Sequence, residues 1–143
     1  MSEHHRLVVA AAREWLGTPY RHQCTQQGIG CDCLGLVRGV WRRILGEEPF
    51  CVPPYAQFGK DPGGASLLLN AAQNMLVPLN GALMPGAVVL FQIHKKIPPR
   101  HCGILIDKGR FIHAQERLGV IELALDKRWQ RRVHSTYAFP IKV

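Results

Sequence analysis

A helix is expected to begin inside the stretch Gly30-Cys31-Asp32-Cys33-Leu34-Gly35-Leu36-Val37. Before this stretch the chain has the prolines, glycines and polar residues of a loop. After it, apolar side chains recur at helical spacing as far as Leu45, and Gly46 ends the pattern. Asp32 is a good N-cap residue, so Cys33 is expected at the first helical position. The helix dipole and the unpaired N–H groups would favour a thiolate there. The alternative is that Cys33 is only a small apolar residue on a buried helix face.

Length and composition indicate a single folded domain. The chain has 143 residues, of which 47% are hydrophobic, and a chain of this size buries roughly two-thirds of its unfolded surface. This excludes a disordered protein. We expect one domain over residues 1–143 and no membrane insertion, because the apolar runs are too short to cross a bilayer. Residues 1–14 lack the form of a signal peptide, so we expect the chain to be made in a reducing cytoplasm, or to leave it by an unusual route.

The net charge of +8 suits an anionic partner such as nucleic acid, a membrane surface or an acidic polymer. Basic residues gather at 94–100 and at 127–132. No helix-turn-helix, zinc-finger or RNP pattern accompanies them, so specific nucleic-acid binding is not expected. For either cluster the alternative is a solvated face that aids solubility.

The five cysteines are expected to be free thiols, because an odd number fits a disulfide framework poorly. Cys24, Cys31 and Cys33 lie near His22 in the sequence and could together bind zinc. Their spacing matches no paired Cys-x-x-Cys site, so neither a metal nor another cofactor is expected.

Apolar periodicity divides the chain into a helical N-terminal part and a C-terminal sheet. Helices are expected over 3–16, 33–45 and 65–77, and strands over 87–93, 101–106, 110–114, 119–123 and 136–143. The segment 47–64 is rich in proline and glycine and is interpreted as a surface loop, with a lid as the alternative. Pro140 favours an edge position for the last strand. Helices followed by an antiparallel five-stranded sheet make an α+β fold.

The turn between the second and third expected strands decides how two histidines are related. If residues 107–109 form a three-residue loop with Gly109 in the left-handed conformation, Gly103 faces His113 across the hairpin. His101 then lies on the same face as a diagonal neighbour, about 7–8 Å away. A two-residue turn would instead send the two histidines to opposite faces.

A cysteine nucleophile needs a base and acid, and that group works best when a third residue holds its tautomer. Cys33, His101 and His113 can fill these three roles if the helix packs its N-terminus on the sheet. Each histidine alone is more often a half-buried structural residue, but the combination favours an enzyme.

Five separated blocks resemble the NlpC/P60 family of cysteine peptidases and span roughly residues 7–125. They are Trp15-Leu16-Gly17-Thr18-Pro19-Tyr20, Cys31-Asp32-Cys33-Leu34-Gly35-Leu36-Val37, Pro85-Gly86-Ala87-Val88-Val89-Leu90-Phe91, His101-Cys102-Gly103-Ile104-Leu105 and Phe111-Ile112-His113-Ala114. The resemblance implies a papain-like α+β fold. It also implies cleavage of peptidoglycan stem peptides, commonly between D-glutamate, linked through its γ-carboxyl, and the diamino acid.

The same resemblance implies roles for individual residues. It makes Cys33 the nucleophile, His101 the base and acid, and His113 the orienting third residue. Tyr20 would lie beside the nucleophile and help the backbone N–H of Cys33 to stabilise the oxyanion. Asp32 matches an acidic residue that can contact substrate in relatives.

The chain departs from the family pattern at two places. Leu34 stands where serine is usual, and Arg21-His22-Gln23 replaces the usual Trp-Gly-Gly. We expect Leu34 to affect which stem peptide fits, and His22 either to line the cleft or to be structural. Neither departure removes a catalytic group.

A narrower resemblance joins residues 19–23, residues 30–40 and the arginine-rich end with Trp129 to the phage-type branch of the family. That branch includes cell-wall peptidases of tailed phages and gene transfer agents. It implies hub or tip proteins of a phage-like tail as partners, incorporation into the particle, and action in the periplasm of the recipient cell. Two alternatives stay open: a tail-tip assembly or plug protein that keeps the fold for binding, and a cysteine-dependent acyltransferase or amidase with a substrate outside the wall.

Overall fold

The structure is a computed structural model of the chain and describes residues 2–49, 51–56 and 62–141, with side chains described from residue 67 onward in the last range. The elements in chain order are α1 (Glu3–Arg13), β1 (Thr25–Gln26), β2 (Gly30–Cys31), α2 (Cys33–Leu45), α3 (Pro62–Met75), β3 (Val77–Pro78), β4 (Val88–Phe91), β5 (His101–Leu105), β6 (Arg110–Gln115), β7 (Gly119–Ala124), α4 (Lys127–Gln130) and β8 (Val133–Ala138). The expected α+β class is confirmed.

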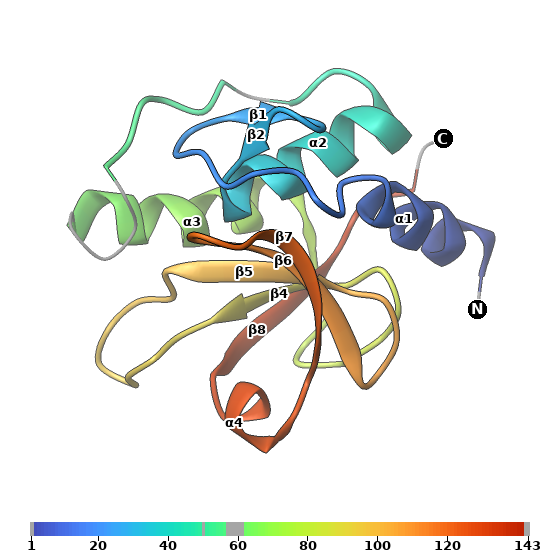
Figure 1. Cartoon of the computed structure of the whole chain (residues 1–143). Coiled ribbons are helices and arrows are strands. Elements are labelled where there is room, and N and C mark those ends of the chain that lie inside the picture. Colours follow the sequence, from blue (N-terminus) through green and yellow to red (C-terminus); the bar gives the residue numbers. More distant parts are fainter. Residues whose placement is uncertain (1, 50, 57–61, 142–143) are drawn as a thin grey trace.

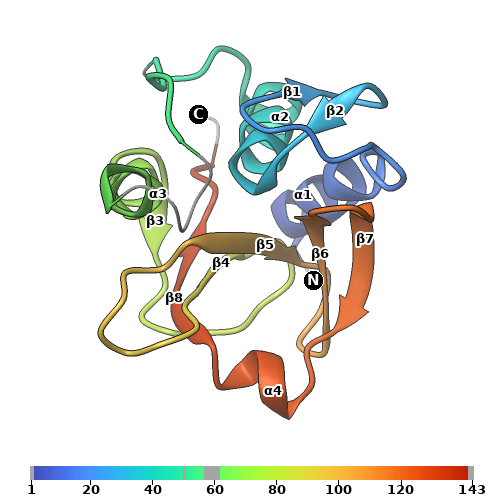
Figure 2. The same ribbon diagram turned by 60° about the vertical axis from the view of Figure 1, so that its left-hand side comes forward.

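The main sheet is antiparallel, with the strand order β3-β8-β4-β5-β6-β7 over the described residues. The helices α1, α2 and α3 cover one face of it, and the short helix α4 lies on the other side (Figures 1 and 2). This arrangement places the start of α2 above the strands that carry the two histidines.

The sheet differs from the five strands expected. It has a sixth strand, β3, because Val77, which was expected to be the last residue of the third helix, instead pairs with Ala138. The last strand covers Val133–Ala138 and lies between β3 and β4, so the expected edge strand over 136–143 is wrong. Pro140 does not interfere with this inner position because it follows the end of the strand.

The N-terminal segments follow the expected pattern with two differences. α1 ends at Arg13 because the chain turns at Gly17 (φ 86°), whose N–H donates to the carbonyl oxygen of Val120 at 3.0 Å. The expected loop over 20–30 contains a small hairpin of β1 and β2. α2 begins and ends where predicted, with Gly46 (φ 89°) as its C-cap.

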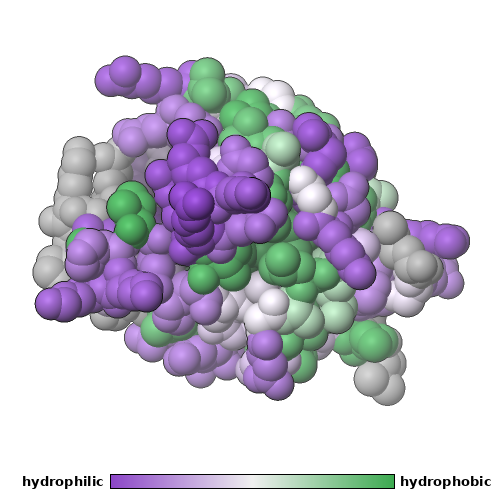
Figure 3. Space-filling view, turned by 90° about the horizontal axis from the view of Figure 1, so that it is seen from below, coloured by the Kyte–Doolittle hydropathy of each residue, from purple (hydrophilic) through white to green (hydrophobic). Residues whose placement is uncertain are grey.

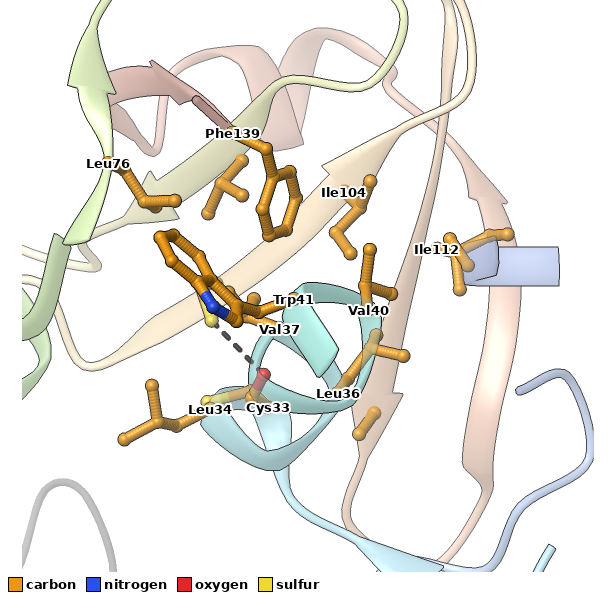
Figure 4. Packing of buried hydrophobic residues seen from close by; sticks show 14 of the residues in the cluster. Cys33, Leu34, Leu36, Val37, Val40, Trp41, Leu76, Ile104, Ile112 and Phe139 are labelled. Atoms are coloured by element: carbon orange, nitrogen blue, oxygen red, sulfur yellow. Dashed lines mark hydrogen bonds between the residues drawn. The ribbon is translucent and has the colours of Figure 1, made fainter. Parts of the chain in front are cut away.

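Two apolar clusters lie on the two faces of the sheet. The larger one joins α1, α2 and α3 to the sheet and includes the inward side chains of α2, which Figure 4 shows beside Ile104, Ile112 and Phe139. Gly39 allows Trp15 to lie against α2, since a Cβ at this position would be 2.0 Å from a ring carbon of Trp15. The smaller cluster lies on the opposite face under α4.

The register of the β5–β6 hairpin is the one expected from a three-residue loop. Ile104 pairs with Ile112, and continuing this register places Gly103 opposite His113. A Cβ on Gly103 would lie 3.3 Å from the Cβ of His113, so the missing side chain makes room at this point. The prediction that His101 and His113 share one face of the hairpin is confirmed by their direct contact, described below.

Three local expectations need correction. Gly109 is not left-handed, and the loop is closed by the Asp107 carboxylate, which accepts from the N–H of Gly109 at 2.7 Å. The third helix begins at Pro62 rather than 65, and 57–61 of the expected 47–64 loop lie outside the described residues. Helix α4 was not expected.

Within the described ranges, no helix has the length and apolar character to cross a membrane.

Candidate active site

Asp32 ties the start of α2 to two neighbouring segments. Its Oδ1 accepts from the N–H of Gly35 at 2.7 Å, as an N-cap residue does. Its Oδ2 accepts from the N–H of Gln23 at 2.7 Å and from the hydroxyl of Tyr55 at 2.5 Å. The residue is 1% exposed. The carboxylate therefore positions the first turn of α2, where Cys33 is the first helical residue.

The surroundings of Cys33 favour its thiolate form. A hydrogen bond from Cys102 and the hydrogen bond and charge of His101 lower the pKa of the Cys33 thiol to about 6, against the opposing effects of burial and of the Asp32 charge. The Cys102 thiol can also donate to the carbonyl oxygen of Cys33, at 3.3 Å (Figure 4). This contact with Cys33 raises the pKa of Cys102 well above its usual range, as does burial, so the proton stays on Cys102.

His101 and His113 form a hydrogen-bonded pair. Nε2 of His101 lies 2.6 Å from Nδ1 of His113, and the two rings meet edge to face. Burial and the neighbouring His101 charge lower the pKa of His113 to about 3, so this ring is neutral near pH 7. A neutral His113 whose Nδ1 accepts from His101 carries its own proton on Nε2. That leaves Nδ1 of His101 for the Cys33 side of the site.

The three residues border one cavity of about 340 Å³, a volume within the range of small-ligand sites. Its lining is Tyr20, Cys33, Arg100, His101, His113, Ala114, Gln115, Glu116, Trp129 and Arg132. Burial and the charge of Cys33 raise the pKa of Tyr20 above its usual range, so the phenol keeps its proton and can donate. The predicted grouping of Cys33, His101, His113 and Tyr20 is therefore present in the structure.

The other three predicted substrate-binding residues do not line this cavity. Asp32 is buried at the N-terminus of α2, and Leu34 packs in the core against α3. Nε2 of His22 lies 2.7 Å from the carbonyl oxygen of Tyr55, and its ring meets the Tyr55 ring edge-on. Asp32 and His22 thus both contact Tyr55, and Leu34 belongs to the core. Direct contact of these three side chains with substrate stays a prediction.

Sequence reasoning did not select several residues that the structure brings to the site. They are Tyr55 beside Asp32, and Arg100, Glu116, Trp129 and Arg132 in the cavity wall. Trp129 packs against His113 with ring centroids 5.3 Å apart, and it stands in α4, a helix too short to show a periodic pattern. Arg100 and Arg132 had a signal in the basic clusters at 94–100 and 127–132, and Arg100 also stands directly before His101.

A metal site does not emerge from these residues. In the described part of the chain, no three histidine, cysteine or acidic side chains are grouped so that they could hold a metal ion. Burial raises the pKa of the Cys31 thiol to about 12, so this buried residue stays protonated.

Comparisons with known proteins identify the family and the fold. The sequence model described as the NlpC/P60 family matches residues 17–137. No curated protein matches the chain. The NlpC/p60 domain of the peptidoglycan hydrolase SagA superposes with a TM-score of 0.64 at 18% identity, over 94% of this chain and 98% of that domain.

Two longer proteins contain a similar domain. An NlpC/P60 family protein from Bacillus cereus has a TM-score of 0.69 at 19% identity, over 94% of this chain and 40% of its own. NlpC2 from Trichomonas vaginalis has a TM-score of 0.64 at 17% identity, over 97% of this chain and 48% of its own. The chain thus spans less than half of either protein, and at these identities the likeness shows a shared fold.

Proposed function

The chain belongs to the NlpC/P60 family, and we propose that it is a cysteine peptidase that cleaves the stem peptides of peptidoglycan. The observation that carries the proposal is the lowered pKa of Cys33 in a cavity shared with the hydrogen-bonded pair of His101 and His113. The substrate class is supported by the same fold in a domain whose parent, SagA, is described as a peptidoglycan hydrolase.

In the proposed reaction the sulfur of Cys33 attacks the carbonyl carbon of the scissile peptide bond. As the carbon–nitrogen bond breaks, Nδ1–H of His101 gives its proton to the leaving amine. A water then attacks the thioester, His101 takes a proton from that water, and the carbon–sulfur bond breaks. His101 regains its proton in this step, so each cycle restores the starting charges.

His113 is the orienting residue in this scheme. Its low pKa keeps Nδ1 available as an acceptor even while His101 is positively charged. The 2.6 Å contact fixes the ring of His101 so that its other nitrogen faces the cysteine.

Two donors would stabilise the oxyanion of the tetrahedral intermediate. Cys33 is the first residue of α2, so its N–H has no acceptor within the helix. The protonated hydroxyl of Tyr20 lines the same cavity. Donors held in place before the reaction are worth several kcal/mol in the transition state, about 2.7–4 kcal/mol for a single one in a well-studied protease.

We place the cut at the bond between the γ-carboxyl of D-glutamate and the diamino acid, on the strength of the sequence resemblance described above. The resemblance of residues 19–23 and 30–40 to the phage-type branch supports a role in a phage-like tail, with hub or tip proteins as partners and the periplasm of a recipient cell as the place of action. If this is right, antibodies against the chain will detect it in purified particles. Its absence from particles would contradict the proposed role in the tail but would leave the proposed peptidase activity unaffected.

The enzymatic proposal is tested by digesting purified Gram-negative sacculi with the wild type, Cys33→Ala and Cys51→Ala. Cys51 is an exposed cysteine that does not line the cavity, so its variant is the matched control. We expect soluble stem fragments from the wild type and Cys51→Ala and none from Cys33→Ala, with the bond identified by mass spectrometry. Equal digestion by Cys33→Ala would overturn the proposal. A folded wild type that releases nothing would favour a structural tail part or a non-wall acyltransferase.

A further inference from the structure

A second cavity, of about 330 Å³, adjoins the one that holds Cys33. The two cavities share part of their lining, including the ring of His101. Cys33 and Tyr20 line only the first cavity, so the second one lies beyond His101 as seen from the nucleophile. Figure 3 views the molecule from the side of α4 and shows strongly hydrophilic side chains next to apolar ones on this face.

The wall of the second cavity is mostly apolar. It is supplied by the end of β4 and by the loop that leads to β5, through Phe91, Ile93, Ile97 and Pro98. The ring of Phe91 stacks on that of His101 with centroids 6.1 Å apart, so the apolar wall reaches the catalytic histidine. Ile93 is 85% exposed and Ile97 37% exposed. An aliphatic chain bound in the cavity would cover this surface and remove it from water.

A guanidinium stands where the two cavities meet. Arg132 lines both of them, and its guanidinium carbon lies 5.2 Å from the centre of the Trp129 ring, over its face. A guanidinium stacked on a ring keeps its edge N–H groups available, and their planar fork matches a carboxylate. The backbone of Arg132 is fixed as well, because its carbonyl oxygen accepts from the N–H of Gln92 at 2.7 Å.

The charges at the second cavity have one sign. Arg100 lines both cavities and adds positive charge beside Arg132. Among the described residues, no acidic side chain lines the second cavity. This environment attracts a carboxylate and repels a lone ammonium group.

The proposed reaction directs the amine side of the substrate towards this cavity. The carbonyl carbon of the scissile bond binds to the sulfur of Cys33, and the leaving nitrogen takes its proton from His101. The substrate therefore runs from its acyl side to its amine side in the direction from Cys33 to His101. The residue that carries the leaving nitrogen, which is the diamino acid, comes next to the second cavity.

We propose that the second cavity binds the side chain of the diamino acid and that Arg132 binds a carboxylate at the end of that side chain. Diaminopimelate fits this description, since its methylene groups would lie against the apolar wall and its terminal carbon carries a carboxylate as well as an ammonium group. Lysine has the aliphatic chain but ends in an ammonium group alone. The inference rests on the proposed function and makes Arg132 a determinant of specificity.

The experiment uses three synthetic γ-D-glutamyl peptides that differ only in the diamino acid. The first contains diaminopimelate, the second contains diaminopimelate amidated at its side-chain carboxyl, and the third contains lysine. A hydrogen-bonded ion pair is lost in the second and third, so kcat/KM of the wild type should be roughly 10- to 100-fold lower for them. Arg132→Gln should lower kcat/KM for the first peptide to about the level of the other two.

Arg131→Gln is the matched control, because Arg131 is exposed, adjacent in sequence and does not line either cavity. It should keep the full preference for the diaminopimelate peptide. Equal cleavage of the three peptides by the wild type, or the same loss of preference in Arg131→Gln and Arg132→Gln, would overturn the proposal.

A binding measurement separates this proposal from the peptidase proposal. Cys33→Ala, which cannot cleave, should bind the diaminopimelate peptide at least roughly tenfold more tightly than its amidated form. Binding can be followed by tryptophan fluorescence, since Trp129 lines both cavities. This preference would support the assignment of Arg132 even if the wild type cleaved none of the peptides. Equal affinities would contradict the assignment even if cleavage were observed.

Discussion

The substitution Asp32→Asn separates two roles of one buried carboxylate. Asparagine is as good an N-cap as aspartate, and its amide oxygen can still accept from the N–H of Gly35. The amide nitrogen that replaces Oδ2 cannot accept from the N–H of Gln23 or from the hydroxyl of Tyr55. The Tyr55 hydroxyl can rotate and accept instead, whereas the Gln23 N–H is left without its charged partner.

The expected cost follows from these contacts. A hydrogen bond to a charged group contributes about 1.5–3 kcal/mol, and a buried donor left unsatisfied costs about 1–3 kcal/mol. Asp32→Asn should therefore lower the free energy of unfolding by about 2–5 kcal/mol, a large part of a total that is typically about 5–15 kcal/mol. Since the charge of Asp32 raises the pKa of Cys33, its removal should also lower that pKa further.

The assay is urea unfolding of the wild type, Asp32→Asn and Asp126→Asn. Asp126 is the exposed N-cap of α4 and accepts a single backbone bond, from Trp129 at 3.0 Å, so its replacement should change the free energy of unfolding by less than about 0.5 kcal/mol. If the two variants lose the same free energy of unfolding, Asp32 acts only as an N-cap, and the contacts of its Oδ2 do not hold the site in place. Tyr55→Phe, which removes the hydroxyl that donates to Oδ2 of Asp32, provides a second variant should Asp32→Asn fail to fold.

Three further predictions concern the thiolate, the second histidine and the packing of α2. The rate of alkylation of Cys33 by iodoacetamide should rise with pH around a midpoint near 6, where the thiolate forms, and a midpoint near the usual thiol value of about 8.5 would contradict the lowered pKa. The pKa of about 3 for His113, below its usual 6.5, means that the unfolded chain binds a proton first as the pH falls. As the pH falls from 6.5 to 3, this residue should therefore lower the free energy of unfolding by at most about 1.4 kcal/mol per pH unit. When the free energy of unfolding in urea is measured at several pH values, it should fall less steeply with decreasing pH in His113→Asn than in the wild type. Gly39→Ala should lower the free energy of unfolding in urea by about 1–3 kcal/mol, because the added Cβ meets the ring of Trp15. In the control Gly109→Ala the nearest atom to the added Cβ is 3.7 Å away, so its free energy of unfolding should stay within about 0.5 kcal/mol of the wild type. Equal losses in the two variants would refute the packing argument.

The parts of the fold that sequence reasoning predicted well depend on neighbouring residues. The bounds of α2 follow from Asp32 as a cap, Gly46 as a stop and the apolar spacing between them. The register that puts His101 beside His113 follows from the length of the 107–109 loop alone. Each of these signals lies within a few residues of the element that it determines.

The parts that were missed depend on distant pairing. β3 has two residues, and it exists because Val77 meets Ala138, about sixty positions away in the chain. That pairing also moves β8 from the edge into the sheet. Helix α4 has four residues, too few for any periodic signal.

The candidate site divides in the same way. Cys33, His101, His113 and Tyr20 stand in recognisable motifs, and the structure places them around one cavity. The Tyr55 hydroxyl donates to Asp32 from a proline-rich segment. Arg132, which lies between α4 and β8, lines the cavity. These last two contacts arise only when segments far apart in sequence pack together. The basic cluster at 127–132 marked Arg132 as a charged position, but its place beside Cys33 and the histidines could not be read from the sequence.

The most direct test of the account is to trap the covalent intermediate on Cys33. Wild-type protein mixed with a stem peptide and quenched in acid within milliseconds to seconds should gain, by intact-protein mass spectrometry, the mass of the acyl portion of the peptide. Digestion should locate that mass on the peptide containing Cys33, and Cys33→Ala should gain none. Cleavage without any adduct on Cys33, or an adduct on another residue such as Cys24 or Cys51, would contradict the central claim.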